Sequence, residues 1–232
     1  MTRLAAALVV LGLAVAAFWH FGIFERLAGE FEARQVRQMD HAAFETWLDA
    51  EAKRRQEFSS LTSFLATAGV GDVVPAWSLL REDAGSPPWC DGAGFSMPPR
   101  AEWRHIVPAL RLVRDKVIPA VGRVELRSGY RTPALNSCVR GAPKSRHLSF
   151  SAVDLVALDQ PDPQTTFAKL CAAWTKAGQR SGWGLGAYFD PARATANGSA
   201  RFHIDGAGWR TWGFSKKSAS SGCRFFATPT KR

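Results

Sequence analysis

Two polar segments that are far apart in the sequence constrain the fold most. The first, 145–154, is a polar loop that runs into the short apolar stretch Ala152–Val156, and this stretch predicts a strand. In the second, Arg201–Asp205, polar and apolar residues alternate, so Phe202 and Ile204 lie on one face of a predicted strand and three polar residues lie on the other. We expect the apolar face to be buried and the polar face to line a site.

Three side chains that bind metals would meet if these two strands were neighbours. His147 lies in the polar loop, Asp154 in the first strand and His203 on the polar face of the second. Two imidazoles and one carboxylate suit catalytic zinc, because they leave the fourth position to water or substrate. A single His or Asp on a strand more often has a structural role, so the prediction of a zinc site depends on the combination.

Three motifs follow one another in the order found in a known family. They are Ser128-Gly129-Tyr130-Arg131-Thr132-Pro133, Ser145-x-His147-x6-Asp154 and Phe202-His203-Ile204-Asp205. From about Val124 to Trp212 the chain therefore resembles the zinc D-alanyl-D-alanine carboxypeptidases, the related endolysin endopeptidases and the D-Ala-D-Ala dipeptidases, which share a fold with the hedgehog signalling domain. The resemblance implies an α+β fold in which a small antiparallel sheet, flanked by helices, carries a zinc ion on His147, Asp154 and His203.

The resemblance also implies roles for residues around the metal. In the family the Arg of the first motif contacts the substrate next to the metal, so the resemblance implies this role for Arg131. We choose the guanidinium of Arg131 as the cation that stabilises the oxyanion, and we expect Tyr130 and Ser145 to contact the substrate as well. Relatives carry the proton acceptor, Asp or Glu, three residues before the last His, where this chain has Ala200. We name Asp205 as the substitute, which either accepts the proton of the water or orients a zinc ligand.

The resemblance implies a zinc-dependent peptidase that acts on the D-amino-acid-containing peptides of peptidoglycan, of the D-Ala-D-Ala carboxypeptidase type. Ala200 leaves a second function open, namely a non-catalytic, zinc-containing module that binds the cell wall. The sequence does not distinguish a carboxypeptidase from an endopeptidase or a dipeptidase. A net charge of +10 also fits a nucleic-acid-binding protein. However, Lys and Arg are spread along the chain without a strongly basic helix, so we expect peptidoglycan and no nucleic acid as partner.

The N-terminal segment is apolar. Leu4–Phe24 follows Arg3 and has His20 as its one strongly polar residue, and as a helix it is long enough to span a bilayer. Cleavage after Ala14-Val15-Ala16 would make it a signal peptide, but aromatic residues prolong the apolar stretch and favour an uncleaved transmembrane anchor. With Arg3 in the cytoplasm, we expect a single-pass protein of the bacterial inner membrane whose catalytic domain faces the periplasm or the exterior.

Beyond this anchor, residues 1–24, composition divides the chain into three parts. Residues 25–58 predict an amphipathic helical linker, 59–214 the peptidase-like domain with its core at 98–214, and 215–232 a basic, partly flexible tail. Within the domain we expect one helix that begins at Pro99 and ends at Pro119, and a second helix at Phe167–Ala177. We expect strands at Val121–Ser128 and Ala187–Phe189. We also expect strands to approach one another closely at Gly182, Gly184 and Gly186.

The chain has four cysteines, Cys90, Cys138, Cys171 and Cys223. An even number in a chain that we expect to be exported favours disulfides over a thiolate metal site. Three pairings are possible, and the sequence does not choose among them.

Overall fold

The structure is a computed structural model that describes residues 40–83, 89–90, 94–160, 162–192 and 200–226. Contacts divide the chain into two units, Met1–Thr46 and Trp47–Arg232. The predicted anchor, 1–24, and the first part of the predicted linker lie outside the described residues. Within the described ranges, no helix is long and apolar enough to cross a membrane.

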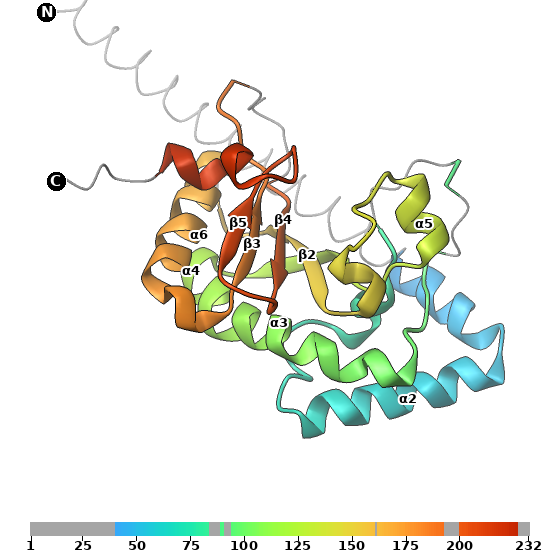
Figure 1. The fold of residues 1–232 in the computed structure, drawn as a ribbon. Coiled ribbons are helices and arrows are strands. Elements are labelled where there is room, and N and C mark those ends of the chain that lie inside the picture. Colours follow the sequence, from blue (N-terminus) through green and yellow to red (C-terminus); the bar gives the residue numbers. More distant parts are fainter. Residues whose placement is uncertain (1–39, 84–88, 91–93, 161, 193–199, 227–232) are drawn as a thin grey trace, which may run out of the picture. The chain divides into compact units, whose positions relative to one another are not determined.

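Five strands form one mixed sheet (Figure 1). They are β1 (Val124–Ser128), β2 (Ala152–Ala157), β3 (Gly184–Ala187), β4 (Phe202–Asp205) and β5 (Arg210–Trp212), in the order β1-β2-β4-β3-β5. Neighbours are antiparallel except β3 and β5, which are parallel. The prediction of an antiparallel sheet is therefore wrong at this edge. The chain reverses after β4 and passes β3, which is itself antiparallel to β4, so β5 must run parallel to β3.

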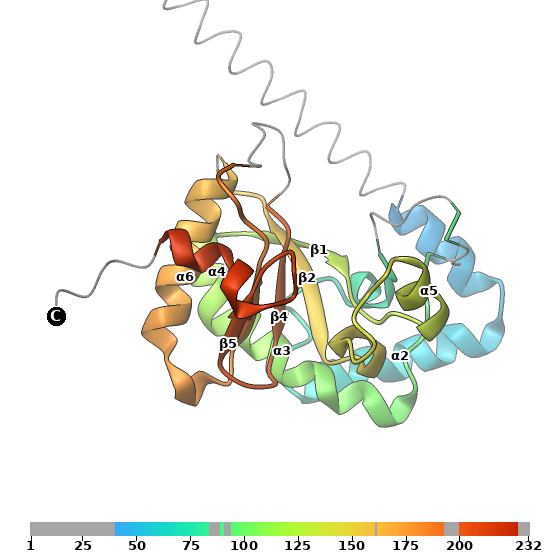
Figure 2. The ribbon, with the colours of Figure 1, turned by 45° about the horizontal axis from the view of Figure 1, so that its top comes forward.

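The helices and 3-10 turns alternate with these strands. The helices are α2 (Ala52–Thr67), α3 (Ile106–Leu112), α4 (Ile118–Val121), α5 (Pro133–Cys138) and α6 (Pro163–Ala177), and residues 40–49 are also helical. Short 3-10 turns are η1 (Ala76–Leu80), η2 (Arg100–His105), η4 (Arg146–Ser149), η5 (Gln179–Ser181), η6 (Ser218–Ser220) and η7 (Gly222–Phe225). Helices α3, α4 and α6 lie along one side of the sheet in both views (Figures 1 and 2). The α+β class is thus as expected.

The face of the sheet that the helices cover forms the core. The alternation predicted for 201–205 explains why apolar side chains lie on this face. Register pairs Val153 with Ile204, Leu155 with Phe202, and Leu185 with Ile204, so these five side chains share one face. All are 0% exposed. Burying a side chain of this kind stabilises a fold by roughly 1.5–3 kcal/mol. The opposite face, with Asp154 and His203, is thereby left to the polar groups.

Pro119 does not end the helix that begins near Pro99. The chain passes from α3 through a π-helical turn, Val113–Val117, into α4, which continues to Val121. Pro119 lies in the first turn of α4, where a missing N–H is tolerated, and the wider turn before it absorbs the proline ring. The helix ends instead at Gly122, whose φ is 82° and where a Cβ would approach Asp159 Oδ2 to 2.5 Å.

Further boundaries differ from the prediction. The first strand begins at Val124 rather than Val121, which belongs to α4, and α6 begins at Pro163 rather than Phe167. The third strand is Gly184–Ala187 rather than Ala187–Phe189, and α2 crosses the expected boundary between residues 58 and 59. The tail has structure through residue 226, so the expected flexibility is wrong for this part. A disulfide joins Cys223 to Cys171 of α6, while the other joins Cys90 to Cys138 at the end of α5. Both disulfides agree with the expectation, and the structure supplies the pairing.

Candidate metal centre

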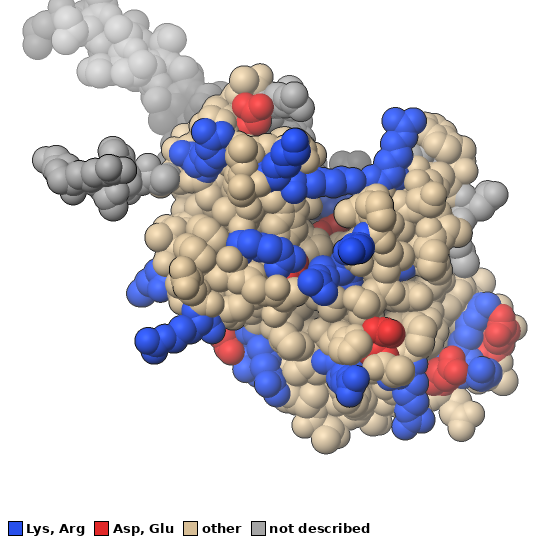
Figure 3. Space-filling model, viewed as in Figure 1, with Lys and Arg blue, Asp and Glu red and all other residues tan. Residues whose placement is uncertain are grey.

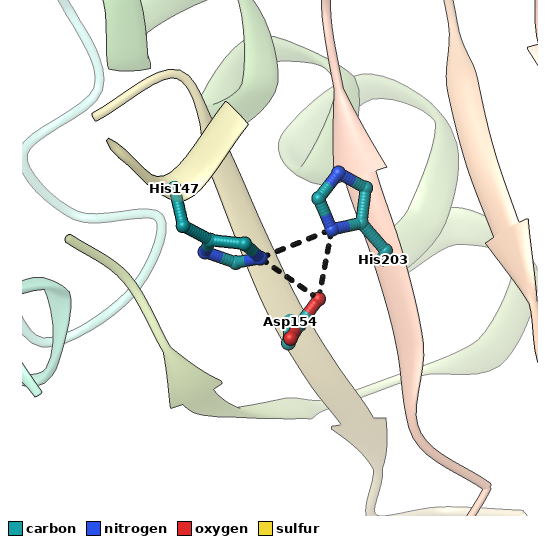
Figure 4. Close-up of side chains that lie close together, drawn as sticks. All are labelled: His147, Asp154 and His203. Carbon is teal, nitrogen blue, oxygen red and sulfur yellow. Dashed lines mark hydrogen bonds and ion pairs between the residues drawn. The ribbon is translucent and has the colours of Figure 1, made fainter. Parts of the chain in front are cut away.

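Asp154 and His203 are direct partners in the register of β2 and β4, and His147 reaches them from η4 (Figure 4). Asp154 Oδ1 lies 2.9 Å from His203 Nδ1 and 3.2 Å from His147 Nε2. The two ring nitrogens are 3.1 Å apart. All three side chains are buried, and their ligand atoms lie within 4.8 Å of one another, so the group could hold a metal ion. The three predicted ligands therefore converge.

In each imidazole, the nitrogen that points away from Asp154 already has a hydrogen-bond partner. This partner determines the protonation of the nitrogen that points toward Asp154. His147 Nδ1 lies 2.7 Å from the carbonyl oxygen of Gly129, and His203 Nε2 lies 3.1 Å from Asp205 Oδ2. Both acceptors require an N–H from the ring, so a neutral imidazole points its other nitrogen, with a lone pair, at its partner and at Asp154. Three electron-rich atoms around one point fit a divalent cation, and two imidazoles with one carboxylate fit zinc.

The sequence before Asp154 holds His147 in place. Ser145 Oγ accepts from the N–H of His147 and so caps η4, and Phe150 ends the turn with a φ of 47° while its ring is 0% exposed. A residue other than glycine at such a φ needs the support of its surroundings, which the buried ring supplies. Ser145 also lines the cleft at the candidate metal site, and its predicted contact with the substrate stays a prediction.

Asp154 presents Oδ1 to the histidines because its other oxygen is engaged. Arg201 Nη2 donates to Asp154 Oδ2 at 2.6 Å, and Arg131 Nη2 lies 3.5 Å from the same atom. Asp83 joins the two cations, accepting from Arg201 at 2.8 Å and from Arg131 at 3.0 Å. The network is largely buried, and removing one partner of such a pair is costly because the other is left buried without compensation.

Arg131 lines the cleft, and its Nη2 bonds to Asp83, Ser128 and Asp154. Its Nε is buried and has no hydrogen-bond partner among the described residues. Tyr130 does not line the cleft. Its side chain is buried, and its ring packs edge-on against Phe150 at 6.3 Å between centroids. The interpretation of Tyr130 as a substrate contact thus gives way to a role in the core.

Both oxygens of Asp205 are occupied, and the residue is 0% exposed. Arg210 donates to Oδ1 at 3.0 Å and to Oδ2 at 2.7 Å, the N–H of Ala207 donates to Oδ1 at 2.8 Å, and Oδ2 also bonds His203. Arg210 reaches Asp205 because Gly184, which lies between them in the sheet, has no side chain. A Cβ there would lie 2.5 Å from Asp205 Oδ1, which confirms the predicted close approach of strands at this glycine.

Burial and charge set the protonation of the site. Burial raises the pKa of Asp154, but the imidazoles and Arg201 outweigh it and hold that pKa well below the usual range. Burial lowers the pKa of His147, and Asp154 offsets this only in part. Burial also lowers the pKa of His203, but the hydrogen bonds with Asp154 and Asp205 raise it overall. For Asp205, burial is outweighed by His203 and Arg210, which bring its pKa to about 2.

The site opens into a cleft of about 570 Å³. Among the described residues that line it, Asp154 and Asp205 are the only carboxylates, and Ala200 supplies none. Sequence reasoning gave no role to several residues at or behind the cleft: Asp83, Tyr188, Arg201, Arg210 and Trp212. Only the alternation in 201–205, which puts Arg201 on the face of His203, could have pointed to one of them.

Comparison with known proteins gives one match. Residues 95–188 match the family model described as Peptidase M15. The matched segment includes Arg131, His147 and Asp154, whereas His203 and Asp205 follow its end. No curated protein and no solved structure matches the chain.

Proposed function

We propose that this chain, which belongs to the peptidase M15 family through residues 95–188, is a zinc-dependent metallopeptidase that cleaves D-amino-acid-containing peptides of peptidoglycan. Peptidases of this family depend on zinc. The observation that carries the proposal is the convergence of His147, Asp154 and His203 in a cleft, with hydrogen bonds that turn one lone pair of each imidazole toward the carboxylate.

Zinc bound by these residues would lower the pKa of a bound water and polarise the scissile carbonyl. The surrounding residues would fix the ligands. Gly129 and Asp205 each hold one imidazole by its outer nitrogen, and Arg201 holds the second oxygen of Asp154. Such partners keep the ligands in one orientation, so little rearrangement is needed during the reaction.

Arg131 is the residue that we propose to contact the developing oxyanion. It lines the cleft next to Asp154. A guanidinium at this place could donate to a substrate oxygen from the cleft, and it offers a planar set of donors. The contacts of Arg131 with Asp83 and Ser128 keep the guanidinium in position for this role.

Asp205 fits the orientation of His203 better than proton transfer. A general base needs a free lone pair within reach of the water, and both oxygens of Asp205 already accept from Arg210 and other donors. This observation also favours a second candidate function, a non-catalytic zinc-containing module that binds the cell wall, because Asp154 and Asp205 are the only carboxylates among the described residues of the cleft.

Hydrolysis of defined peptidoglycan peptides distinguishes the two functions. The full-length chain is loaded with zinc, mixed with muropeptides that end in D-Ala-D-Ala or contain cross-links, and the products are read by mass spectrometry. We expect loss of a terminal D-Ala, as in a D-Ala-D-Ala carboxypeptidase, and loss of activity with chelator or in His147→Ala. Products that match a cut cross-link would redefine the enzyme as an endopeptidase, while zinc binding without any cleavage would support the binding module.

We further propose that Leu4–Phe24 anchors the protein in the bacterial inner membrane, with the peptidase domain in the periplasm or outside the cell. The apolar segment behind Arg3 supports this orientation, and two disulfides fit an oxidising compartment. Fractionation and N-terminal sequencing of the mature protein test it. A mature chain that begins near Ala17 would mean that the segment is a cleaved signal peptide.

A further inference from the structure

The cleft above the metal site has exposed cations on both walls. One wall is the segment 139–147, which contributes Arg140, Lys144 and Arg146, and the other is formed by β5 and the tail, with Lys216. We call these four residues the cleft cations. Figure 3 shows Lys and Arg side chains around a hollow on this face of the molecule, with acidic atoms at its bottom.

The charge of the cleft cations is not neutralised by the cleft itself. Arg131 and Arg210 are paired with buried carboxylates, but the cleft cations form no ion pair with any described residue. The carboxylates that line the cleft, Asp154 and Asp205, are already bound by the histidines, Arg201 and Arg210. Positive charge that is concentrated around a concave site attracts anionic ligands and orients them as they approach.

Two disulfides and one hydrogen bond restrain the backbone that carries the cleft cations. Cys138 immediately precedes the first wall and is bound to Cys90, while Cys223 anchors the tail to α6. Lys216 Nζ donates to the carbonyl oxygen of Arg140 at 2.9 Å and so joins the two walls. Cations on such a fixed backbone lose less conformational freedom when a ligand binds than cations on a free loop would.

From this arrangement we infer that the cleft selects peptides that carry free side-chain carboxylates close to the bond to be cleaved, and that Arg140, Lys144 and Arg146 recognise these carboxylates. The inference rests on the proposed peptidase function. A peptide fits better than a nucleic acid because the buried His147–Asp154–His203 group lines the cleft, and a volume of about 570 Å³ suits a short peptide.

A matched pair of labelled peptides tests the inference. The two have the same D-amino-acid-containing sequence, but one has free side-chain carboxylates and the other has them amidated. Binding to the full-length chain is measured by fluorescence anisotropy, with and without zinc, at low and high salt. We expect the free carboxylates to strengthen binding about tenfold, which is about 1.4 kcal/mol, and salt to reduce this preference.

Charge-matched variants locate the effect. Arg140→Gln, Lys144→Gln and Arg146→Gln together should abolish the preference, whereas Arg140→Lys with Arg146→Lys should keep it. The control removes the same charge elsewhere, with Lys116→Gln, Lys176→Gln and Arg180→Gln, which are exposed and do not line the cleft. Circular dichroism confirms that each variant is folded.

The outcomes separate this inference from the proposed function. Equal binding of the two peptides, or an equal loss of preference in the control variant, overturns the inference even if both peptides are hydrolysed. An oligonucleotide of the same net charge that competes as well as the acidic peptide also overturns it. A preference that is retained without hydrolysis of either peptide supports the inference and contradicts the peptidase.

Discussion

Arg210 holds Asp205 by two hydrogen bonds that pass over Gly184 on the intervening strand, at 3.0 and 2.7 Å. Asp205 in turn accepts from His203, so a cation on the edge strand β5 helps to orient a candidate metal ligand on β4. The contact needs three strands in the right order and a glycine on the middle one. The geometry of the candidate metal site thus depends on the edge of the sheet as well as on its centre.

Gly184→Ala should weaken zinc binding. The added Cβ would lie 2.5 Å from Asp205 Oδ1 and 2.7 Å from Arg210 Nη1, so the carboxylate must move away from His203. Loss of such an orienting partner typically costs about 10–100-fold in metal affinity. Competition with a chromogenic chelator measures the zinc affinity of the variant and of the wild type. Gly178→Ala is the control: its φ of 66° also disfavours alanine, but nothing lies within 4 Å of the added Cβ, so it should destabilise the fold and leave zinc affinity unchanged.

Asp205→Ala distinguishes the two roles considered for this carboxylate. We expect zinc affinity to fall by about 10–100-fold, because His203 Nε2 loses its acceptor and the ring can turn. The turnover of chains that are saturated with zinc should change much less. If the zinc-saturated variant instead keeps only a small residual turnover, and the pH profile of that turnover has lost its acidic limb, Asp205 is the proton acceptor after all.

Local pattern and the resemblance of the three motifs to a known family together predicted the three candidate ligands. Alternation places His203 and the apolar core residues on opposite faces of one strand. The local sequence did not predict the residues that hold these candidate ligands in place. Asp83 comes from a loop far before Arg131 and Arg201, and Arg210 depends on β3 lying between β4 and β5. Which strands become neighbours is decided by packing of the whole sheet, so these contacts leave no signal in the local sequence.

Two errors show where a local rule was overridden by its surroundings. Proline usually ends a helix, but a π-helical turn before Pro119 lets the helix continue. The Ser- and Lys-rich composition of the tail predicts flexibility, yet Cys223 is bound to Cys171, and Ser221 bonds Thr211 at 2.7 Å. A covalent link outweighs composition, and its pairing was not available from the sequence.

Zinc binding should release protons, and the number of protons released per zinc ion should be larger at lower pH. In the metal-free chain the pKa of His203 is raised, because its bonds with Asp154 and Asp205 outweigh burial. The stability that this proton supplies is fully present below the unfolded pKa of about 6.5 and is lost as the pH rises through the folded pKa. Zinc takes the neutral ring, so its affinity should fall with falling pH. Calorimetry in buffers of different ionisation enthalpy, at about pH 6 and about pH 8, counts the protons. Equal, near-zero release at both would contradict this assignment.

Each disulfide should stabilise the domain substantially. The sequence separations are 48 residues for Cys90–Cys138 and 52 for Cys171–Cys223, and cross-links that close loops of this length contribute about 4 kcal/mol in the chain-entropy account. We expect Cys90→Ala with Cys138→Ala, and Cys171→Ala with Cys223→Ala, each to lower the free energy of unfolding in urea by up to this amount. A reducing agent should destabilise the wild type further than either pair. Wild-type unfolding that is insensitive to reduction would mean that the disulfides are not formed.

Substitution of Arg131 should lower turnover more than it lowers zinc occupancy. Arg131→Ala removes the donor that we propose for the oxyanion, and loss of one such group typically lowers kcat by about 10²–10³-fold. Asp83 keeps Arg201 as its partner in this variant, so the network around Asp154 is not left without a cation. Arg131→Lys keeps the charge but not the planar fork, and it should recover only part of kcat with full zinc occupancy. Zinc content, thermal melting and kcat are measured on the same samples. If Arg131→Lys has the kcat of the wild type, a simple positive charge is sufficient, and if Arg131→Ala also retains it, the oxyanion is stabilised by another group.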